Sequence, residues 1–296
     1  MQQDATRRCA YLTMRDPGDF VTDYDISFDA MAALGWQVEA VTWDDPAQRW
    51  DDFDAVYICT PWDYPAKQQQ FIDVLTAIDR SSAILVNDLS LVHWTLEKTY
   101  LRDLAERGAA IVPSLWHAAF DVGQVARWFE SLGAGKVVVK PQVGANAQDT
   151  FVLERPVPDA TLAALARIFA NKPFFVQPFM QRVQTDGEYS LFFFGNEYSH
   201  AIRKVPAAGD FRTQEEHGAE ILSITATAGM IDAAERILAL VHPAPAYVRA
   251  DFVADDADNY LLMELELIEP SLYLRTDPGA AARFAAAFDE HVRGKR

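Results

Sequence analysis

The segment AYVRADFVADDADNYLLMELEL, residues 246–267, restricts the possible folds more than any other part of the chain. Two apolar runs enclose a polar loop of even length, residues 255–260, and charged residues recur at every second position, which predicts an antiparallel β-hairpin. This alternation places Arg249 and Asp251 on one face of the first strand. It places Glu264 and Glu266 on one face of the second. With Asp251 opposite Glu264, three carboxylates and one arginine share a single patch.

Three carboxylates on one poorly solvated face repel one another unless positive charge offsets them. One interpretation is a buried ladder of ion pairs, in which Arg249 offsets one carboxylate. The other is a magnesium site, because Mg²⁺ takes one or two protein carboxylates and completes its shell with water and substrate phosphates. The magnesium interpretation gains weight if the chain holds phosphate-binding residues elsewhere.

Residues 136–150, KVVVKPQVGANAQDT, have phosphate-binding chemistry. The pattern predicts a strand that ends at Lys140, followed by a loop of small residues that includes Gly144 and Ala145. Backbone N–H groups of such a loop can approach an anion, and a lysine supplies a point charge to phosphate oxygens. Strand-end lysines and small-residue loops are also common without a ligand. The segment matches neither G-x-x-x-x-G-K-[ST] nor G-x-G-x-x-G, which argues against a P-loop and a Rossmann cofactor site.

Residues 174–180, FFVQPFM, have the form of an apolar strand that runs into a polar linker. One interpretation is an adenine site near Gln177 and Met180, with Glu188 accepting from ribose hydroxyls. The alternative is a core strand with a polar edge. Lys204 and Arg212 follow on a predicted strand and loop, and in an acidic chain they are candidate phosphate contacts, although scattered basic residues are normally solvated.

The order of predicted strands and helices divides the chain into three parts. Residues 1–92 alternate strands and helices, which predicts a small parallel sheet whose first and third strands end at MRDPGDF and PWDY, where ligands bind in such sheets. Residues 93–175 begin with the predicted helix WTLEKTYLRDLAERG and a strand at 109–116, and they contain the phosphate loop. Residues 176–296 show the alternation of an antiparallel sheet. The fold class is therefore α/β (α+β).

The net charge limits the class of partner. Lys and Arg total 26 against 43 Asp and Glu, and the net charge of -17 argues against nucleic-acid and anionic-membrane binding; solubility is its simplest explanation. No apolar run approaches bilayer length, and the N-terminus lacks the apolar core of a secretion signal. We therefore expect a cytoplasmic protein in which Cys9 and Cys59 are buried thiols.

Taken in order, these features resemble the ATP-grasp superfamily, which includes glutathione synthetase and D-alanine:D-alanine ligase. The resemblance covers residues 94–274, and the N-terminal sheet looks like the domain that precedes the grasp in these ligases. It implies two lobes that enclose ATP, with ATP and Mg²⁺ as cofactors. It also implies an ADP-forming reaction in which a substrate carboxyl becomes an acyl phosphate and an amine attacks it.

The resemblance implies a role for each candidate residue. Lys98 in LEKTYL looks like the family's first phosphate-binding lysine and Lys140 like the second, with residues 143–150 as the loop over the phosphates. Many relatives have E-x-N where this chain has E-L-E, so Glu266 adds a negative charge. The other implied contacts are with adenine and ribose at Gln177, Met180 and Glu188, with the terminal phosphate or acyl group at Lys204 and Arg212, with the tetrahedral oxyanion at Arg249, and with Mg²⁺ at Asp251, Glu264 and Glu266.

A narrower resemblance to D-cycloserine-forming ligases rests on ANAQDT in the loop and ELIEPSLY after the second hairpin strand. It implies that Glu269, Ser271 and Arg275 face a small amino-acid-like substrate that undergoes ring closure. A kinase on the same scaffold and a non-catalytic nucleotide-binding module are the alternatives. Related ligases are often dimers, so a homodimer is one expected state, although no feature of the chain marks an interface.

Overall fold

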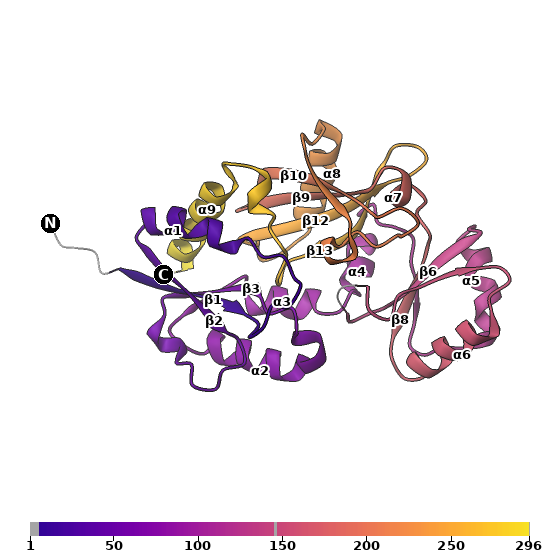
Figure 1. Ribbon diagram of the computed structural model, residues 1–296, viewed down its shortest axis with the longest axis horizontal. Helices are drawn as coiled ribbons and strands as arrows, with labels where there is room; N and C mark the ends of the chain where they lie inside the picture. The colour runs from indigo at the N-terminus through magenta and orange to yellow at the C-terminus, as the bar shows by residue number, and fades with distance from the viewer. Residues whose placement is uncertain (1–5, 145–146, 296) are drawn as a thin grey trace.

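The computed structural model describes residues 6–144 and 147–295. Figure 1 shows an N-terminal sheet beside a central sheet, with a smaller sheet at one end of the molecule. The N-terminal sheet is parallel and the other two are antiparallel. This arrangement confirms the predicted α/β class.

The N-terminal sheet is built as its alternating strands and helices predicted. Its strand order is β2-β1-β3-β4, with β1 (Arg7–Thr13), β2 (Trp36–Thr42), β3 (Ala55–Thr60) and β4 (Ile84–Val86). The helices of this part are α1 (Phe28–Ala33), α2 (Gln68–Asp79) and α3 (Leu89–Thr95), with 3-10 helices η1 (Tyr24–Ser27), η2 (Trp50–Asp52) and η3 (Tyr64–Lys67). Cys9 and Cys59 are buried free thiols, as expected. Burial raises the pKa of both thiols well above their ordinary value.

The last helix, α9 (Ala280–Lys295), packs on the first sheet. In Figure 1 it lies beside α1, although the two helices are far apart in the sequence. Phe284 contacts Tyr57 of β3 at 5.2 Å between ring centroids, and Phe288 contacts Trp36 of β2 at 5.4 Å. The N-terminal sheet, α9 and part of the central sheet therefore share one hydrophobic core.

The middle part of the chain forms a small lobe, which contains a sheet of order β5-β8-β6-β7 and has its own hydrophobic core. Its strands are β5 (Leu115–His117), β6 (Lys136–Pro141), β7 (Phe151–Glu154) and β8 (Phe174–Pro178), and its helices are α5 (Val125–Ser131), α6 (Asp159–Ile168) and η4 (Val122–Gln124). The predicted strand at 109–116 is wrong in extent, because only its last residues belong to β5. Ile111 instead bridges to Leu262 of the central sheet, whose N–H and C=O pair with Ala110 and Val112.

The central sheet has the order β11-β10-β9-β12-β13. Its strands are β9 (Glu188–Phe194), β10 (Glu197–Val205), β11 (Glu220–Ile224), β12 (Tyr247–Ala254) and β13 (Tyr260–Glu266). The elements around it are α4 (Tyr100–Glu106), α7 (Arg182–Thr185), α8 (Ala228–Leu238), η5 (Glu215–His217) and η6 (Leu274–Thr276). Helix α8 was not predicted from the sequence; it begins where the Thr227 side chain accepts a hydrogen bond from the Met230 N–H at 3.3 Å.

The hairpin of β12 and β13 has the predicted pairs of opposite residues, but its loop length and its register differ from the prediction. Asp251 lies opposite Glu264 and Arg249 opposite Glu266, as expected. The predicted even loop is wrong, because Ala254 pairs with Tyr260 and leaves five loop residues, 255–259. The register shifts between Asp251 and Phe252, so Met263 is an extra residue. A bulge of this kind turns the following side chains to the opposite face, which brings both glutamates to the face of Asp251.

The predicted single helix at 94–108 is also wrong, because α3 ends at Thr95 and α4 begins at Tyr100. Lys98 lies in the break, and its backbone N–H donates to the Gln142 carbonyl at 2.8 Å. That bond ties the break to the loop after β6. It positions Lys98 between the small lobe and the central sheet, which a continuous helix would not do.

A buried asparagine connects the N-terminal and central sheets. The Asn87 amide donates to the carbonyls of Tyr247 at 3.0 Å and Leu267 at 2.9 Å, and its oxygen accepts from the Ala246 N–H at 2.6 Å. We expect Asn87→Ala to lower the free energy of unfolding by at least about 2 kcal/mol, because it leaves three buried backbone groups unpaired. Urea unfolding would measure this loss, with Gln69→Ala at an exposed position as the control. Equal stability of the two variants would contradict it.

No helix in residues 6–144 and 147–295 has both the length and the apolar character required to cross a bilayer.

Candidate functional site

A cavity of about 260 Å³ lies between the central sheet, the small lobe and two loops of the N-terminal sheet. It is lined by residues of all three parts of the chain. Most of the predicted site residues meet there, although they span more than half of the sequence. Those that line the cavity are Lys98, Lys140, Gly144, Gln177, Met180, Glu188, Lys204, Arg212, Arg249, Asp251, Glu264, Glu266, Glu269 and Ser271.

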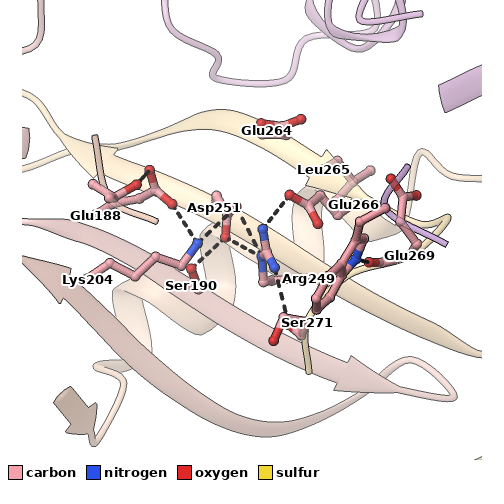
Figure 2. Close-up of polar contacts among 12 residues, drawn as sticks. Glu188, Ser190, Lys204, Arg249, Asp251, Glu264, Leu265, Glu266, Glu269 and Ser271 are labelled. Atoms are coloured by element: carbon pink, nitrogen blue, oxygen red, sulfur yellow. Dashed lines mark hydrogen bonds and ion pairs between the residues drawn. The ribbon is translucent and has the colours of Figure 1, made fainter. Parts of the chain in front are cut away.

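Arg249 is the cation at the centre of the carboxylate patch. Figure 2 shows its guanidinium between Asp251 and Glu266. Its Nε–H lies 3.1 Å from an Asp251 oxygen, an Nη2–H donates to Glu266, and an Nη1–H donates to the Ser271 carbonyl at 3.2 Å. The ion-pair ladder that was one interpretation of the hairpin is therefore present. It uses two of the three carboxylates.

The Asp251 carboxylate has two further partners. Ser190 of β9 donates to it at 2.6 Å, and the Lys204 ammonium lies 3.5 Å from it. Burial alone would raise the pKa of Asp251, but Arg249 and Lys204 together lower it below its ordinary value. Asp251 is therefore an anion fixed in position by three neighbours.

Two lysines of the site are held by carboxylates. Lys98 lies 2.5 Å from Glu264, and Lys204 lies 2.8 Å from Glu188. Burial opposes the charge of Lys98, but Glu264 outweighs it and raises the pKa of this lysine. The same ion pair lowers the pKa of Glu264 against the effect of burial. If any of these four side chains contacts a ligand as predicted, it must give up an ion pair that it makes in this structure.

Lys140 differs from the other two lysines. Among the described residues, its ammonium has no hydrogen-bond or ion-pair partner. Burial lowers its pKa against the opposing charges of Glu264 and Glu188, and Lys98 acts in the same direction as burial. A half-buried cation without a direct ion-pair partner is unfavourable. An anionic group bound in the cavity would relieve this cost.

Two carboxyl groups, Glu266 on β13 and Glu269 in the segment after it, have pKa values raised toward neutrality. Desolvation and the nearby charges of Glu264 and Asp251 raise the pKa of Glu266 to about 7, against the opposing effect of Arg249. Desolvation and the charge of Glu266 raise the pKa of Glu269 to about 8. At this end of the cavity burial and negative charge therefore outweigh the nearby positive charge, and a bound cation would lower both pKa values.

The donor set fits a magnesium ion that is bound together with phosphate. Asp251, Glu264 and Glu266 offer hard carboxylate oxygens from two adjacent strands. Within the described part of the chain, no three acidic, histidine or cysteine side chains are placed to hold a metal ion by themselves. Oxygens from a second ligand would complete the coordination shell, as Mg²⁺ commonly requires.

We therefore expect MgCl₂ alone to leave the melting temperature nearly unchanged, whereas ATP with MgCl₂ should raise it. At an ATP concentration about 100-fold above its Kd the increase should be about 5–10 °C, because binding stabilises only the folded state. Differential scanning fluorimetry would measure the shift, with ATP and EDTA as the control. An equal shift with MgCl₂ alone would indicate a metal site made by the protein only.

Two predicted residues have other ion-pair partners, and the position of a third is not described. Ala145 lies outside the described residues. Arg212 lines the cavity, but its guanidinium pairs with Asp210 at 2.7 Å. Arg275 is not among the residues that line the cavity; it lies 2.5 Å from Glu215 and 3.3 Å from Asp23. Contact of Arg275 with a substrate stays a prediction.

Sequence reasoning missed four residues that contact the predicted ones. Ser190 binds Asp251, and Thr213 donates to Glu188 at 2.9 Å. Ser190 follows Glu188 by two positions in an apolar strand, so the alternation that exposed the carboxylates could have identified it. Trp62 and Tyr64, in the PWDY segment, line the cavity and contact Glu269. No local signal pairs them with Glu269, which is about 200 residues away in the sequence.

Three comparisons with known proteins agree with this geometry. Residues 9–87 match the family model for the N-terminal domain of D-cycloserine synthetase DcsG. The chain is 30% identical over 288 residues to the cycloserine biosynthesis protein DcsG of Streptomyces lavendulae, covering 92% of this chain and 95% of that protein. The crystal structure of D-cycloserine synthetase DcsG superposes with a TM-score of 0.85 at 28% identity, covering 96% of this chain and 99% of the other.

A more distant structure extends the likeness in fold. The ATP-grasp ligase PsnB, in complex with a minimal precursor, Mg and ADP, has a TM-score of 0.66 at 15% identity over 98% of this chain and 99% of its own. At that identity the match concerns the fold alone.

Proposed function

This chain belongs to the family of ATP-grasp ligases that includes D-cycloserine synthetase DcsG, and we propose that it closes a ring within a small amino-acid-like molecule. The proposed reaction uses ATP and Mg²⁺, converts the substrate carboxyl to an acyl phosphate and forms a C–N bond with release of ADP and phosphate. The proposed substrate is O-ureido-serine or a close analogue. It is the type of acid implied by a relative that covers nearly the whole chain.

The observation that carries this proposal is the distribution of charge around the cavity. One lysine, Lys140, has no anionic partner in the described residues, and three carboxylates lie within the reach of a single bound group. A nucleotide phosphate supplies the anion, and the metal ion that accompanies it supplies the cation. MgATP therefore complements the cavity at both places.

We assign the end of the cavity that binds phosphate from the positions of two lysines. Lys140 would contact the phosphate oxygens at once, and Lys98 would do so after leaving Glu264. Both would offset the charge that spreads over the transferring phosphoryl group. Mg²⁺ held by Asp251, Glu264 and Glu266 would neutralise phosphate charge and polarise the group under attack.

The adenine end follows from β8 and its linker. Gln177 is buried, and its amide donates to the Ser114 hydroxyl at 3.0 Å, so its orientation is fixed. We assign Gln177 and Met180 to the adenine ring and Glu188 to the ribose. The ribose contact requires Glu188 to release Lys204 or Thr213, which now bind its two oxygens.

Arg249 is suited to stabilise negative charge on the oxygen of the substrate carbonyl that is attacked. A guanidinium has five N–H groups, and Arg249 uses its Nε–H and one N–H of each terminal nitrogen for Asp251, Glu266 and the Ser271 carbonyl. Two N–H groups remain for an oxyanion. Because its position is set by three partners, it would stabilise the tetrahedral intermediate without rearranging.

The substrate end is assigned to Glu269 and Ser271, with Arg275 as a further candidate. Glu269 lies where burial and negative charge outweigh the nearby positive charge, so it would accept a substrate ammonium group. Arg212 and Lys204 would approach the terminal phosphate or acyl group. We further propose a cytoplasmic location and a small-molecule substrate; a homodimer stays a prediction.

The test is an assay of the purified protein with ATP, MgCl₂ and O-ureido-serine. We expect ADP and phosphate in equal amounts, with a cyclic product in the mass spectrum. A stable phosphorylated acid would instead indicate a kinase. If the protein released no ADP with either stereoisomer of O-ureido-serine, the ring-closure proposal would be overturned.

A further inference from the structure

The PWDY segment after β3 contacts Glu269 in two ways. The Trp62 indole N–H donates to the Glu269 backbone carbonyl at 2.9 Å, and the Tyr64 hydroxyl hydrogen-bonds its carboxyl group. The Trp62 ring also packs against Phe20, from the loop after β1, at 5.1 Å between centroids. Loops from two neighbouring parallel strands therefore reach the end of the cavity where Glu269 lies.

Trp62 lies between two cavities. It lines the main cavity and also a smaller one of about 20 Å³, which has room for about one water molecule. The small cavity is also lined by Tyr57, Cys59 and Leu274. Ser271 borders both cavities as well, but its side chain is small. Trp62 and Ser271, which border both cavities, form the partition between them, and Trp62 has the larger side chain of the two.

The partition lies close to the proposed reaction centre. Arg249 joins Glu266 to the Ser271 carbonyl, and Glu269 lies between these two residues in the sequence. The adenine end, with Gln177 and Met180, is lined by a different part of the chain, β8 and its linker. An acid with its carboxyl group near Arg249 and its ammonium group at Glu269, as proposed above, therefore lies beside Trp62.

The geometry points to Trp62 as the residue that sets the length of the substrate acid. This assignment rests on the proposed function and deepens it. The indole closes the cavity beside Glu269, so an acid with a longer side chain meets the ring. The hydrogen bond to the Glu269 carbonyl and the contact with Phe20 hold the ring in this position.

The experiment compares two acids, O-ureido-serine and its homologue with one more methylene, O-ureido-homoserine. Wild-type protein should favour the shorter acid in kcat/KM by at least about 10-fold, which is the range for one methylene at a closed apolar wall. Trp62→Ala should reduce this preference to about 3-fold or less, mainly by lowering KM for the longer acid. Trp62→Phe keeps a ring at the wall and should retain the preference.

Tyr64→Phe is the matched control. It removes a hydrogen bond to the same glutamate without opening the wall, so it should change the rates with both acids by a similar factor. Trp62→Leu serves if the alanine variant does not fold, as judged by its melting curve. Retention of the wild-type preference in folded Trp62→Ala or Trp62→Leu would overturn the assignment.

Failure of the proposed function gives a different result. If wild-type protein releases no ADP with either acid, ring closure of such acids is excluded, and the wall is then tested by crystallography. The Trp62→Ala structure should show one continuous cavity that extends to Tyr57 and Leu274. Two cavities that stay separate in that variant would overturn the role of Trp62.

Discussion

Glu264→Gln is expected to lower kcat by about 100- to 1,000-fold with ATP and MgCl₂, because loss of one metal-binding carboxylate removes several kcal/mol of transition-state stabilisation. The fold should persist, since glutamine has the same shape and its amide oxygen can still accept from Lys98. Steady-state ADP release would measure the rate. The matched control is Glu154→Gln on β7, where the glutamate is exposed and pairs with Lys136 at 3.1 Å.

The same variant separates binding from turnover. Glu264 holds Lys98 at 2.5 Å, so removing its charge weakens this contact and makes the lysine more available to phosphate. We therefore expect ATP to bind Glu264→Gln in the presence of EDTA at least as tightly as it binds wild-type protein. Isothermal titration would measure this affinity. Wild-type turnover in the variant would exclude the metal role of Glu264.

Arg249→Met is expected to lower the free energy of unfolding by about 3–5 kcal/mol, because it removes the cation that two buried or half-buried carboxylates share. Turnover should also be lost. Urea unfolding at neutral pH would measure the change in stability.

Arg283→Met provides the comparison for this variant. Arg283 pairs with Asp277 at 2.5 Å on the surface, with 41% of its side chain exposed. An exposed pair contributes at most about 1 kcal/mol, so the control should unfold close to the wild-type midpoint. If Arg249→Met also did so, the carboxylates would not depend on this arginine for their charge balance.

The hairpin shows how far local pattern can carry a prediction. Alternation identified the face that Arg249, Asp251, Glu264 and Glu266 share, because side chains on a strand alternate strictly between two faces. The loop length was wrong by one residue, and the bulge at Met263 corrected the register. Apolar residues suit either side of a buried hairpin, so no residue type marked the bulge.

The break between α3 and α4 could not be predicted either, because no residue type in the sequence marks it. Residues 94–108 keep a helical spacing of apolar side chains, including Tyr100, Leu101 and Leu104, which pack into the core of the central sheet. The helix ends at Thr95 because Lys98 bonds to Gln142, a contact with a segment about 40 residues away. Tertiary contacts of this kind override local propensity.

The contribution of the N-terminal sheet to the site was only partly predictable. The rule for parallel sheets indicated that PWDY lies beside a ligand crevice. That Trp62 would meet Glu269, in the segment after β13, depended on the packing of two sheets against each other. Similarly, the order of charges along the chain identified the lysines, but only the fold showed that Lys98 and Lys204 are paired and Lys140 has no partner in the described residues.

The packing of α9 on the first sheet has a consequence for how the protein is made. Tyr57 and Trp36 are synthesised early, but the aromatic rings that cover them, Phe284 and Phe288, are added more than 200 residues later. At typical ribosomal speeds this delay is about 10–50 s. During that time the first sheet has an uncovered apolar face. The nascent chain therefore cannot complete its first domain before the rest, and its folding is expected to finish as a single event after synthesis of α9.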